Sequence, residues 1–273
     1  MTRILSMAQT EFRIALRNRW VTVAVAMMVL FSLVLSAAGS APTGDLGADR
    51  LSVIVASLTS LAVYLVPLVA LLMSFDAVAG EVERGTLPLL LTYPLSRTEV
   101  LLGKLLAHLA VLTIAIGAGY GLAAIGAWAM DGRSVEGLPA LWRLTWSSVT
   151  LGAVFLGAGY ALSSLARRPS GAAGLAIGLW LGAIVLYDLG LLAALVADNG
   201  GVFTTRVFPW AMLANPADAF RLFNLAASEA TSAAVGLSGA ANTIPPWQAL
   251  TSLALWPVLA LALAVAAFRK VTP

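Results

Sequence analysis

The fold of this chain is decided by residues 51–104, which read LSVIVASLTSLAVYLVPLVALLMSFDAVAGEVERGTLPLLLTYPLSRTEVLLGK. The first part, Leu51–Met73, is long and apolar enough to cross a membrane as one helix, since a span needs about 20 mostly apolar residues. A charged segment and a short leucine-rich segment follow, and Val100 begins a second apolar stretch. This pattern predicts two transmembrane helices joined by a structured loop.

The composition of the whole chain agrees with this prediction. Of its 273 residues, 60% are hydrophobic and 11% are charged, and the mean hydropathy is +0.92. A soluble domain averages about 25% charged residues, so this chain lacks the charge to cover a water-facing surface. We expect an all-α polytopic membrane protein with six transmembrane helices within residues 20–268: Trp20–Ala38, Leu51–Met73, Val100–Met130, Trp142–Leu165, Gly171–Val196 and Trp247–Phe268.

Basic residues predict the orientation of these spans. Of the 16 Lys and Arg residues, the majority fall in the N-terminal segment, the second and fourth loops and the C-terminal tail, residues 269–273. Because cytoplasmic loops carry the excess of Lys and Arg, we expect both termini in the cytoplasm.

Residues 1–19 have the pattern of an amphipathic helix. Leu5, Phe12 and Leu16 fall on one helical face, and Arg13 lies away from it. Such a helix is typical of the cytoplasmic membrane interface. The alternative, a cleaved signal peptide, is disfavoured because the segment is long and contains Glu11.

Small residues mark one face of the fifth span. Gly174, Gly178 and Gly182 follow Gly171 and lie four residues apart, so they line up on one side of a helix. Small residues at this spacing let helix backbones approach closely in lipid. The face either packs within the chain or forms a contact or a moving seam between subunits.

The loop of residues 76–97 contains the most distinctive pattern. Gly85 permits a sharp turn, Thr86 is a candidate N-cap, and the leucines that follow predict a short helix. Ser96 and Glu99 have the spacing of a capping box for the third span. A short apolar helix in water needs cover, so it either lies at the membrane surface or docks into another protein.

This loop resembles the signature of ABC-2-type permeases in the run GEVERGTLPLLLTYPLSRTEVLLGK, and AQTEFRIALRNRW at residues 8–20 fits the same family. The resemblance implies the ABC-2 (type V exporter-like) permease fold, a second copy of the chain in a dimer, and ATP and Mg bound by a separate ATPase subunit. The short helix would be the coupling helix that sits in a groove of the ATPase. The residues given this coupling role are Glu81, Glu83, Arg84, Gly85, Thr86 and Leu87.

A narrower resemblance is to the permeases of complexes that mature nitrous oxide reductase. It is carried by the same loop, by SLTSLAVYLVPLVALLMSFDAVAGE at residues 57–81, and by LANPADAFRLFNL at residues 213–225. It implies a bacterial inner-membrane protein that works with a cytoplasmic ATPase and a periplasmic β-helical protein, with copper-site (CuZ) assembly as the output.

Residues 197–246 form the one long extracytoplasmic loop that we expect. Asn215 is a candidate N-cap for a helix whose first residue is Pro216. That helix either lies on the lipid surface or docks to an outer partner, and the resemblance favours docking. The residues expected to contact this partner are Phe208, Trp210, Phe220, Arg221 and Phe223.

Asp188 lies inside the predicted fifth span, where a carboxylate is costly and is a functional candidate. It either belongs to a cation pathway, as in a stand-alone channel or secondary transporter, or is protonated and hydrogen-bonded to another helix. We expect no metal site, because the chain has no cysteine and a single histidine, His108. The sequence contains no nucleotide-binding loop and no catalytic motif, so we expect no enzyme and no cofactor on this chain.

Overall fold

The computed structural model describes residues 2–38, 50–92, 95–130, 137–166, 168–225 and 244–271. Every regular element in these ranges is helical. The elements are α1 (Thr2–Leu16), α2 (Arg19–Ala38), α3 (Arg50–Ser74), α4 (Ala79–Glu83), α5 (Leu87–Leu91), α6 (Arg97–Met130), α7 (Leu138–Leu165), α8 (Pro169–Trp180), η1 (Leu181–Leu186), α9 (Tyr187–Asp198), η2 (Phe203–Val207), α10 (Phe208–Ala214), α11 (Pro216–Leu225) and α13 (Pro246–Arg269).

Five helical segments of the described chain are long and apolar enough to cross a membrane, and α1 with α2 makes a sixth when the two are counted as one bent span. The bend between α1 and α2 is 73°. The five segments are Leu51–Glu83, Arg97–Ala129, Leu138–Leu165, Pro169–Asp198 and Pro246–Arg269. The prediction of an all-α, polytopic membrane protein is therefore confirmed.

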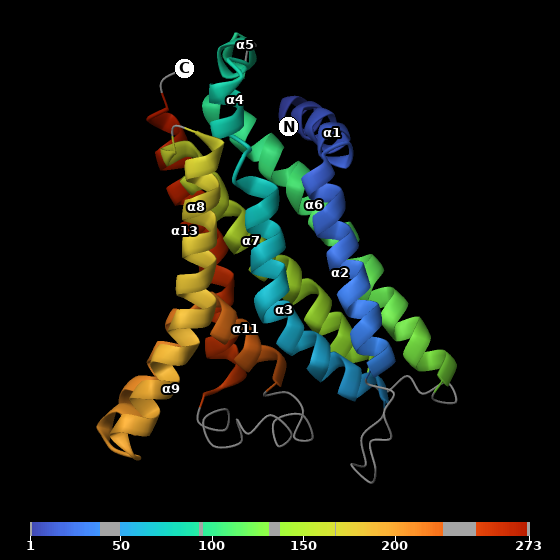
Figure 1. The fold of residues 1–273 in the computed structure, drawn as a ribbon, viewed down its shortest axis with the longest axis vertical. Helices are drawn as coiled ribbons and strands as arrows, with labels where there is room; N and C mark the ends of the chain where they lie inside the picture. The colour runs from blue at the N-terminus through green and yellow to red at the C-terminus, as the bar shows by residue number, and fades with distance from the viewer. Residues whose placement is uncertain are drawn as a thin grey trace.

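The two ends of the helix bundle differ (Figure 1). At one end, which we call the α5 end, α4 and α5 project beyond the long helices, and α1 and the last turn of α13 lie beside them. At the other end, which we call the α11 end, the terminal part of α9 splays outward and α11 sits between the long helices. Both termini of the described chain therefore lie at the α5 end.

The centre of the bundle is built on α7. This helix packs against α3, α13 and α6, while α6 also packs against α1 and α2. Close packing here needs a glycine, because a Cβ at Gly157 would lie 2.9 Å from the Cβ of Ala260 on α13. Buried side chains such as Ile54, Leu58 and Leu112 belong to the hydrophobic core to which α3, α6 and α7 contribute.

The fifth span, made of α8, η1 and α9, is barely packed against the rest of the described chain. In its most apolar window, 6% of the residues are buried. A Cβ at Gly174, Gly178 or Gly182 would meet no described atom within 4 Å. Packing inside one chain, one of the two roles open for these glycines, therefore does not occur in the part of the chain that the structure describes.

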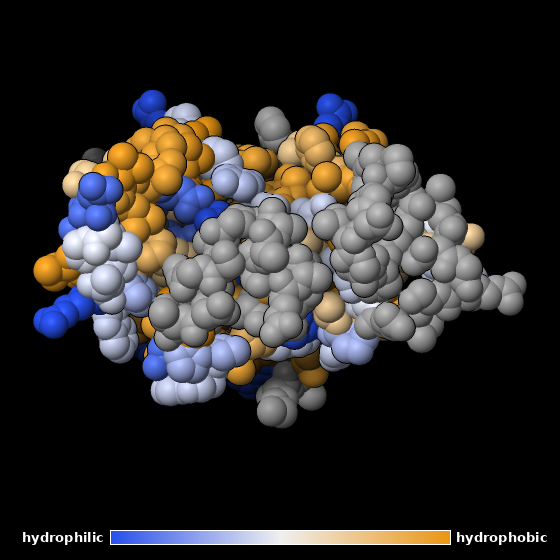
Figure 2. All heavy atoms as spheres, turned by 90° about the horizontal axis from the view of Figure 1, so that it is seen from below, coloured by the Kyte–Doolittle hydropathy of each residue, from blue (hydrophilic) through white to orange (hydrophobic). Residues whose placement is uncertain are grey.

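Helix α11 is an interior helix and does not lie on a lipid surface. It packs against α13, α3 and α7, and Phe220 at its centre is 0% exposed. The predicted N-cap is present, since Asn215 Oδ1 accepts a hydrogen bond of 2.9 Å from the backbone N–H of Ala217. The surface at this end carries hydrophilic groups between larger hydrophobic areas (Figure 2).

Candidate functional site

The α4–α5 turn changes direction at Gly85, whose φ of +66° lies in the left-handed region that favours glycine. Thr86 precedes α5, but its hydroxyl donates to the carbonyl of Glu81 at 3.3 Å and makes no cap bond. The prediction of Thr86 as a side-chain cap is therefore wrong. The capping box that starts α6 is confirmed, because Ser96 N donates to Glu99 Oε2 at 2.7 Å and Glu99 N donates to Ser96 Oγ at 3.2 Å.

The turn has one buried side and one exposed side. Leu87 is 1% exposed and packs in a cluster with Val78 and Leu101, whereas Leu89 is 66% exposed. Among the residues expected to couple to an ATPase, Glu81 and Leu87 are buried. The members that remain on the surface are Glu83, Arg84, Gly85 and Thr86. Leu89 is an additional candidate for contact with an ATPase, which the resemblance to ABC-2-type permeases did not indicate.

Glu81 is buried because it belongs to an ion cluster. Lys104 Nζ lies 2.6 Å from Glu81 Oε1 on α4 and 2.8 Å from Glu11 Oε1 on α1. Lys104, Glu11 and Glu81 are 4%, 7% and 8% exposed. We call these three residues the Lys104 cluster, and it joins α1, α4 and α6. In this conformation Glu81 cannot contact a partner protein directly.

Three polar residues in the N-terminal third of α6 contact neighbouring helices. Arg97 Nη1 donates to the carbonyl oxygens of Phe268 and Val271 at the end of α13, at 3.3 and 2.6 Å. Lys104 contacts α1 and α4, and His108 Nδ1 lies 2.7 Å from Tyr160 Oη of α7. These contacts make α6 the common support of the α5 end.

Helix α7 fixes the start of α4 from the other side. Ser163 Oγ accepts hydrogen bonds from the backbone N–H groups of Val78 and Ala79, at 3.0 and 2.9 Å. Because Ser163 is 0% exposed, these bonds are shielded from water. The link between α3 and α4 is therefore attached to the bundle and is not a free loop.

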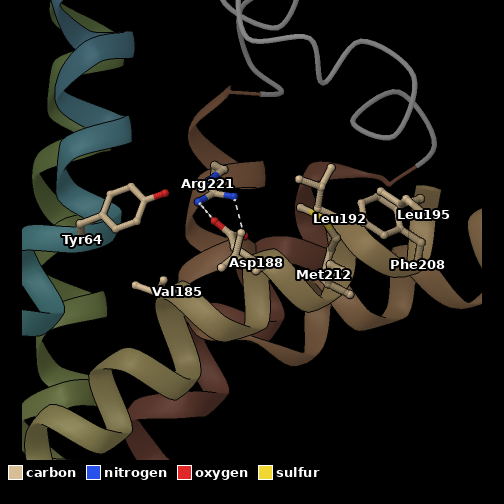
Figure 3. Close-up of a pocket in the computed structure, with 10 residues that line it drawn as sticks. Tyr64, Val185, Asp188, Leu192, Leu195, Phe208, Met212 and Arg221 are labelled. Carbon is tan, nitrogen blue, oxygen red and sulfur yellow. Dashed lines mark hydrogen bonds and ion pairs between the residues drawn. The ribbon is translucent and has the colours of Figure 1, made fainter. Parts of the chain in front are cut away.

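The α11 end has its own polar site, built on Asp188 (Figure 3). Arg221 of α11 donates from Nη1 to Asp188 Oδ1 at 3.1 Å and from Nη2 to Asp188 Oδ2 at 2.8 Å. Arg221 also lies 3.2 Å from Asp218 Oδ1. The sequence reading placed Asp188 and Arg221 in different sites with different roles, and the structure brings them together as a bidentate ion pair.

Burial dominates the chemistry of Asp218 on α11. Its side chain is 3% exposed, and this burial raises the pKa of Asp218 to about 7, although the nearby Arg221 opposes the shift. Arg221 faces two carboxylates, and their charges and the hydrogen bond to Asp188 raise its pKa despite burial. Asp188, Asp218 and Arg221 therefore form a cluster of ionisable side chains at the junction of α9 and α11.

A pocket of about 370 Å³ opens beside this ion pair. Asp188 and Arg221 form its polar side, Tyr64 of α3 points toward them, and Leu192, Phe208 and Met212 form the apolar side (Figure 3). The charges are already paired with each other, so the pocket offers a ligand mostly apolar contact.

The segment before Asp188 is held by hydrogen bonds with α10 and with Asn215, the residue before α11. Residues 181–186 form the π-helix η1, a geometry that often marks functional sites. Asn215 Nδ2 donates to the carbonyl of Ala183 at 2.6 Å, and Tyr187 Oη donates to the carbonyl of Ala211 at 2.7 Å. Together with the ion pair, these bonds attach the fifth span to α10 and α11.

The aromatic residues expected to dock an outer partner divide into buried and exposed ones. Phe208 and Phe220 are 7% and 0% exposed, so they are packing residues in this conformation. Phe223 lies against Trp146, with ring centroids 5.3 Å apart in an edge-on contact. Trp210 is 69% exposed and remains the clearest surface candidate of the set.

Comparison with known proteins gives the family. Residues 5–271 match the ABC-2 family transporter protein family. A probable ABC transporter permease protein NosY from Pseudomonas aeruginosa is 44% identical over 272 residues, which is 97% of either chain. A protein of the same description from Stutzerimonas stutzeri is 40% identical over 275 residues, which is 99% of either chain. With its several apolar spans, the chain is a multi-pass membrane protein that belongs to the ABC-2 family of ABC transporter permeases.

Proposed function

We propose that this permease couples ATP hydrolysis by a separate cytoplasmic ATPase, resembling NosF, to a periplasmic β-helical protein, resembling NosD. Its output is assembly of the copper site (CuZ) of nitrous oxide reductase, by mechanical transmission or by substrate transport. The similarity to NosY permeases over nearly the full length supports this assignment. In this arrangement the protein lies in the bacterial inner membrane, with the α5 end in the cytoplasm.

The observation that carries the proposal is the two-sided packing of α5. Leu87 anchors the helix in the bundle, while Leu89 is 66% exposed and the turn before α5 carries the exposed residues Glu83 and Arg84. An exposed leucine on a fixed helix, next to charged groups, is suited to a hydrophobic groove with a polar rim in a partner. This surface is where the ATPase binds in our proposal.

A path of packed helices runs from this surface to the α11 end. The span-length segment of residues 51–83 runs from α3 through a short link, residues 75–78, into α4. Helix α11 packs against α3 and α7, and Arg221 of α11 holds Asp188 of the fifth span. A displacement of α4 therefore reaches the fifth span and α10 through helices in direct contact.

The fifth span supplies the contact with a second copy of the chain. Its face with Gly174, Gly178 and Gly182 has no described atom within reach of an added Cβ, and glycines at this spacing favour close helix–helix contact in lipid. A pair of permeases would then contact each other along this span.

The alternative function, a stand-alone channel or secondary transporter, needs Asp188 as an available carboxylate. Asp188 accepts two hydrogen bonds from Arg221, so a cation would have to compete with a bidentate guanidinium. The pairing and the family membership both disfavour this alternative.

The test is co-purification of the chain with its ATPase after Leu89→Asp or Glu83→Lys. Leu89→Asp adds a charge at the proposed contact and Glu83→Lys reverses one. Neither change removes a buried group, so the permease should remain folded and lose the ATPase. Asn199→Asp is a control that also adds one negative charge, because Asn199 is exposed in the turn that follows α9, at the opposite end of the bundle. Full retention of the ATPase by both loop variants would refute the proposed binding surface.

A further inference from the structure

Burying the charged groups of the Lys104 cluster costs free energy. Moving three charged groups out of water carries a desolvation penalty, and buried ion triads are often replaceable by apolar residues without loss of stability. This cluster also has two carboxylates for one ammonium, and Glu81 Oε2 is buried with no hydrogen-bond partner among the described residues. Stability alone is therefore a weak reason for its presence.

The position of the cluster indicates what it connects. Helix α1 packs against α6 and α2, whereas α4 packs against α7 and α8. Lys104 extends from α6 to both groups, since it pairs with Glu11 on α1 and Glu81 on α4. The cluster is thus an ionic link between the N-terminal helix and the turn that carries α5.

The residue beside Lys104 brings α1 close enough for this link. A Cβ at Gly103 would lie 2.6 Å from Met7 Cγ and 2.8 Å from Met7 Cβ. Only glycine at this position lets the two helix backbones approach, so that Glu11 reaches Lys104. Gly103 and Lys104 act together in docking α1.

We propose that Lys104 is a positioning residue that clamps α1 to the α4–α5 turn, so that the N-terminal helix moves with the turn when the ATPase displaces it. Glu81 then contributes to coupling through Lys104 and not through contact with the ATPase. The proposal rests on the proposed function, because the displacement comes from the partner ATPase.

The experiment measures the movement of α1 in the reconstituted permease–ATPase complex. The chain has no cysteine, so Gln9→Cys on α1 and Val258→Cys on α13, both at exposed positions, carry two spin labels. Labelled chains are diluted with unlabelled ones, and the distance is compared between nucleotide-free and ATP-trapped complexes. The key variant replaces the whole cluster by methionine, with Glu11→Met, Glu81→Met and Lys104→Met combined, because an apolar replacement preserves packing.

We expect the wild-type complex to show an ATP-dependent distance change, and the triple methionine variant to fold, bind the ATPase, hydrolyse ATP and lose that change. The exchanged pair Glu81→Lys with Lys104→Glu keeps the composition of the cluster and should recover part of the change. Lys270→Met, at an exposed cation of the same end, should behave as wild type. A distance change of wild-type size in the triple variant would overturn the clamp, whereas its absence from the wild-type complex would overturn the proposed function itself.

Discussion

The bidentate pair at the α11 end gives a quantitative prediction for Arg221→Met. The pair is well shielded, since the side chains of Arg221 and Asp188 are 17% and 28% exposed. Removing one partner of a buried ion pair costs about 3–5 kcal/mol, because the other charge is left uncompensated. Partial exposure of Asp188 puts our expectation at the lower end, about 3 kcal/mol. The effect should be largest at pH 8, where Asp218, with its pKa of about 7, is also ionised.

A double-mutant cycle separates the pair from the surrounding packing. The free energy of unfolding is measured in detergent micelles for Arg221→Met, for Asp188→Leu and for the combination of both. Because the combination removes both charges, it should be more stable than the sum of the single effects predicts, with a coupling energy of about 1–3 kcal/mol. Additive effects of the two changes would refute the ion pair as a stabilising contact.

Three further predictions concern Asp218, Gly103 and Gly178. Burial raises the pKa of Asp218 from 3.8 to about 7, so between these pH values the folded protein retains a proton that the unfolded chain has lost. This contribution to stability is complete below pH 3.8 and disappears as the pH rises through 7. Asp218→Asn should therefore flatten the plot of unfolding free energy against pH over that range. Gly103→Ala should speed hydrogen–deuterium exchange in α1 and destabilise its packing by about 1–3 kcal/mol, whereas Gly117→Ala on the same helix, where an added Cβ meets nothing within 4 Å, should not. Gly178→Cys should form a disulfide-linked dimer under oxidation, and Val258→Cys should stay monomeric, while equal cross-linking of the two variants would contradict a dimer contact at the glycine face.

The spans and two of the three predicted caps could be predicted from the sequence, because both depend on local patterns. A run of apolar residues long enough to cross the bilayer is visible without knowledge of its neighbours. Asn215 before Pro216, and Ser96 three residues before Glu99, satisfy backbone groups within the same turn. Thr86 shows the limit of this reasoning, since its hydroxyl is oriented toward the carbonyl of Glu81, five residues earlier, and accepts no hydrogen bond from the first turn of α5.

The ion pairs could not be predicted from the sequence, because the two partners of each pair are far apart in the chain. Lys104 and Glu11 are separated by 93 positions, and Asp188 and Arg221 by 33. From the sequence, Glu81 and Arg221 are therefore predicted to contact partner proteins, and Asp188 is a functional candidate inside the fifth span. For Glu81 this interpretation was incorrect in the described conformation, since its carboxylate is paired inside the bundle. One signal was present, because a lysine within the first turns of an apolar span needs a counter-ion.

The two ion sites connect the ends of the bundle in different ways, and this difference bears on how force would pass through the permease. At the α5 end, Lys104 holds α1 and α4 against α6, which is itself packed along α2 and α7. At the α11 end, Arg221 holds the fifth span, which has little other packing in the described chain. A displacement at α4 is therefore shared among several helices, including α8 at the start of the fifth span. The later part of the fifth span, η1 and α9, is held at the α11 end through a few polar contacts. Weakening Arg221 should release α9 without loosening the α5 end, and weakening Lys104 should loosen the α5 end without releasing α9.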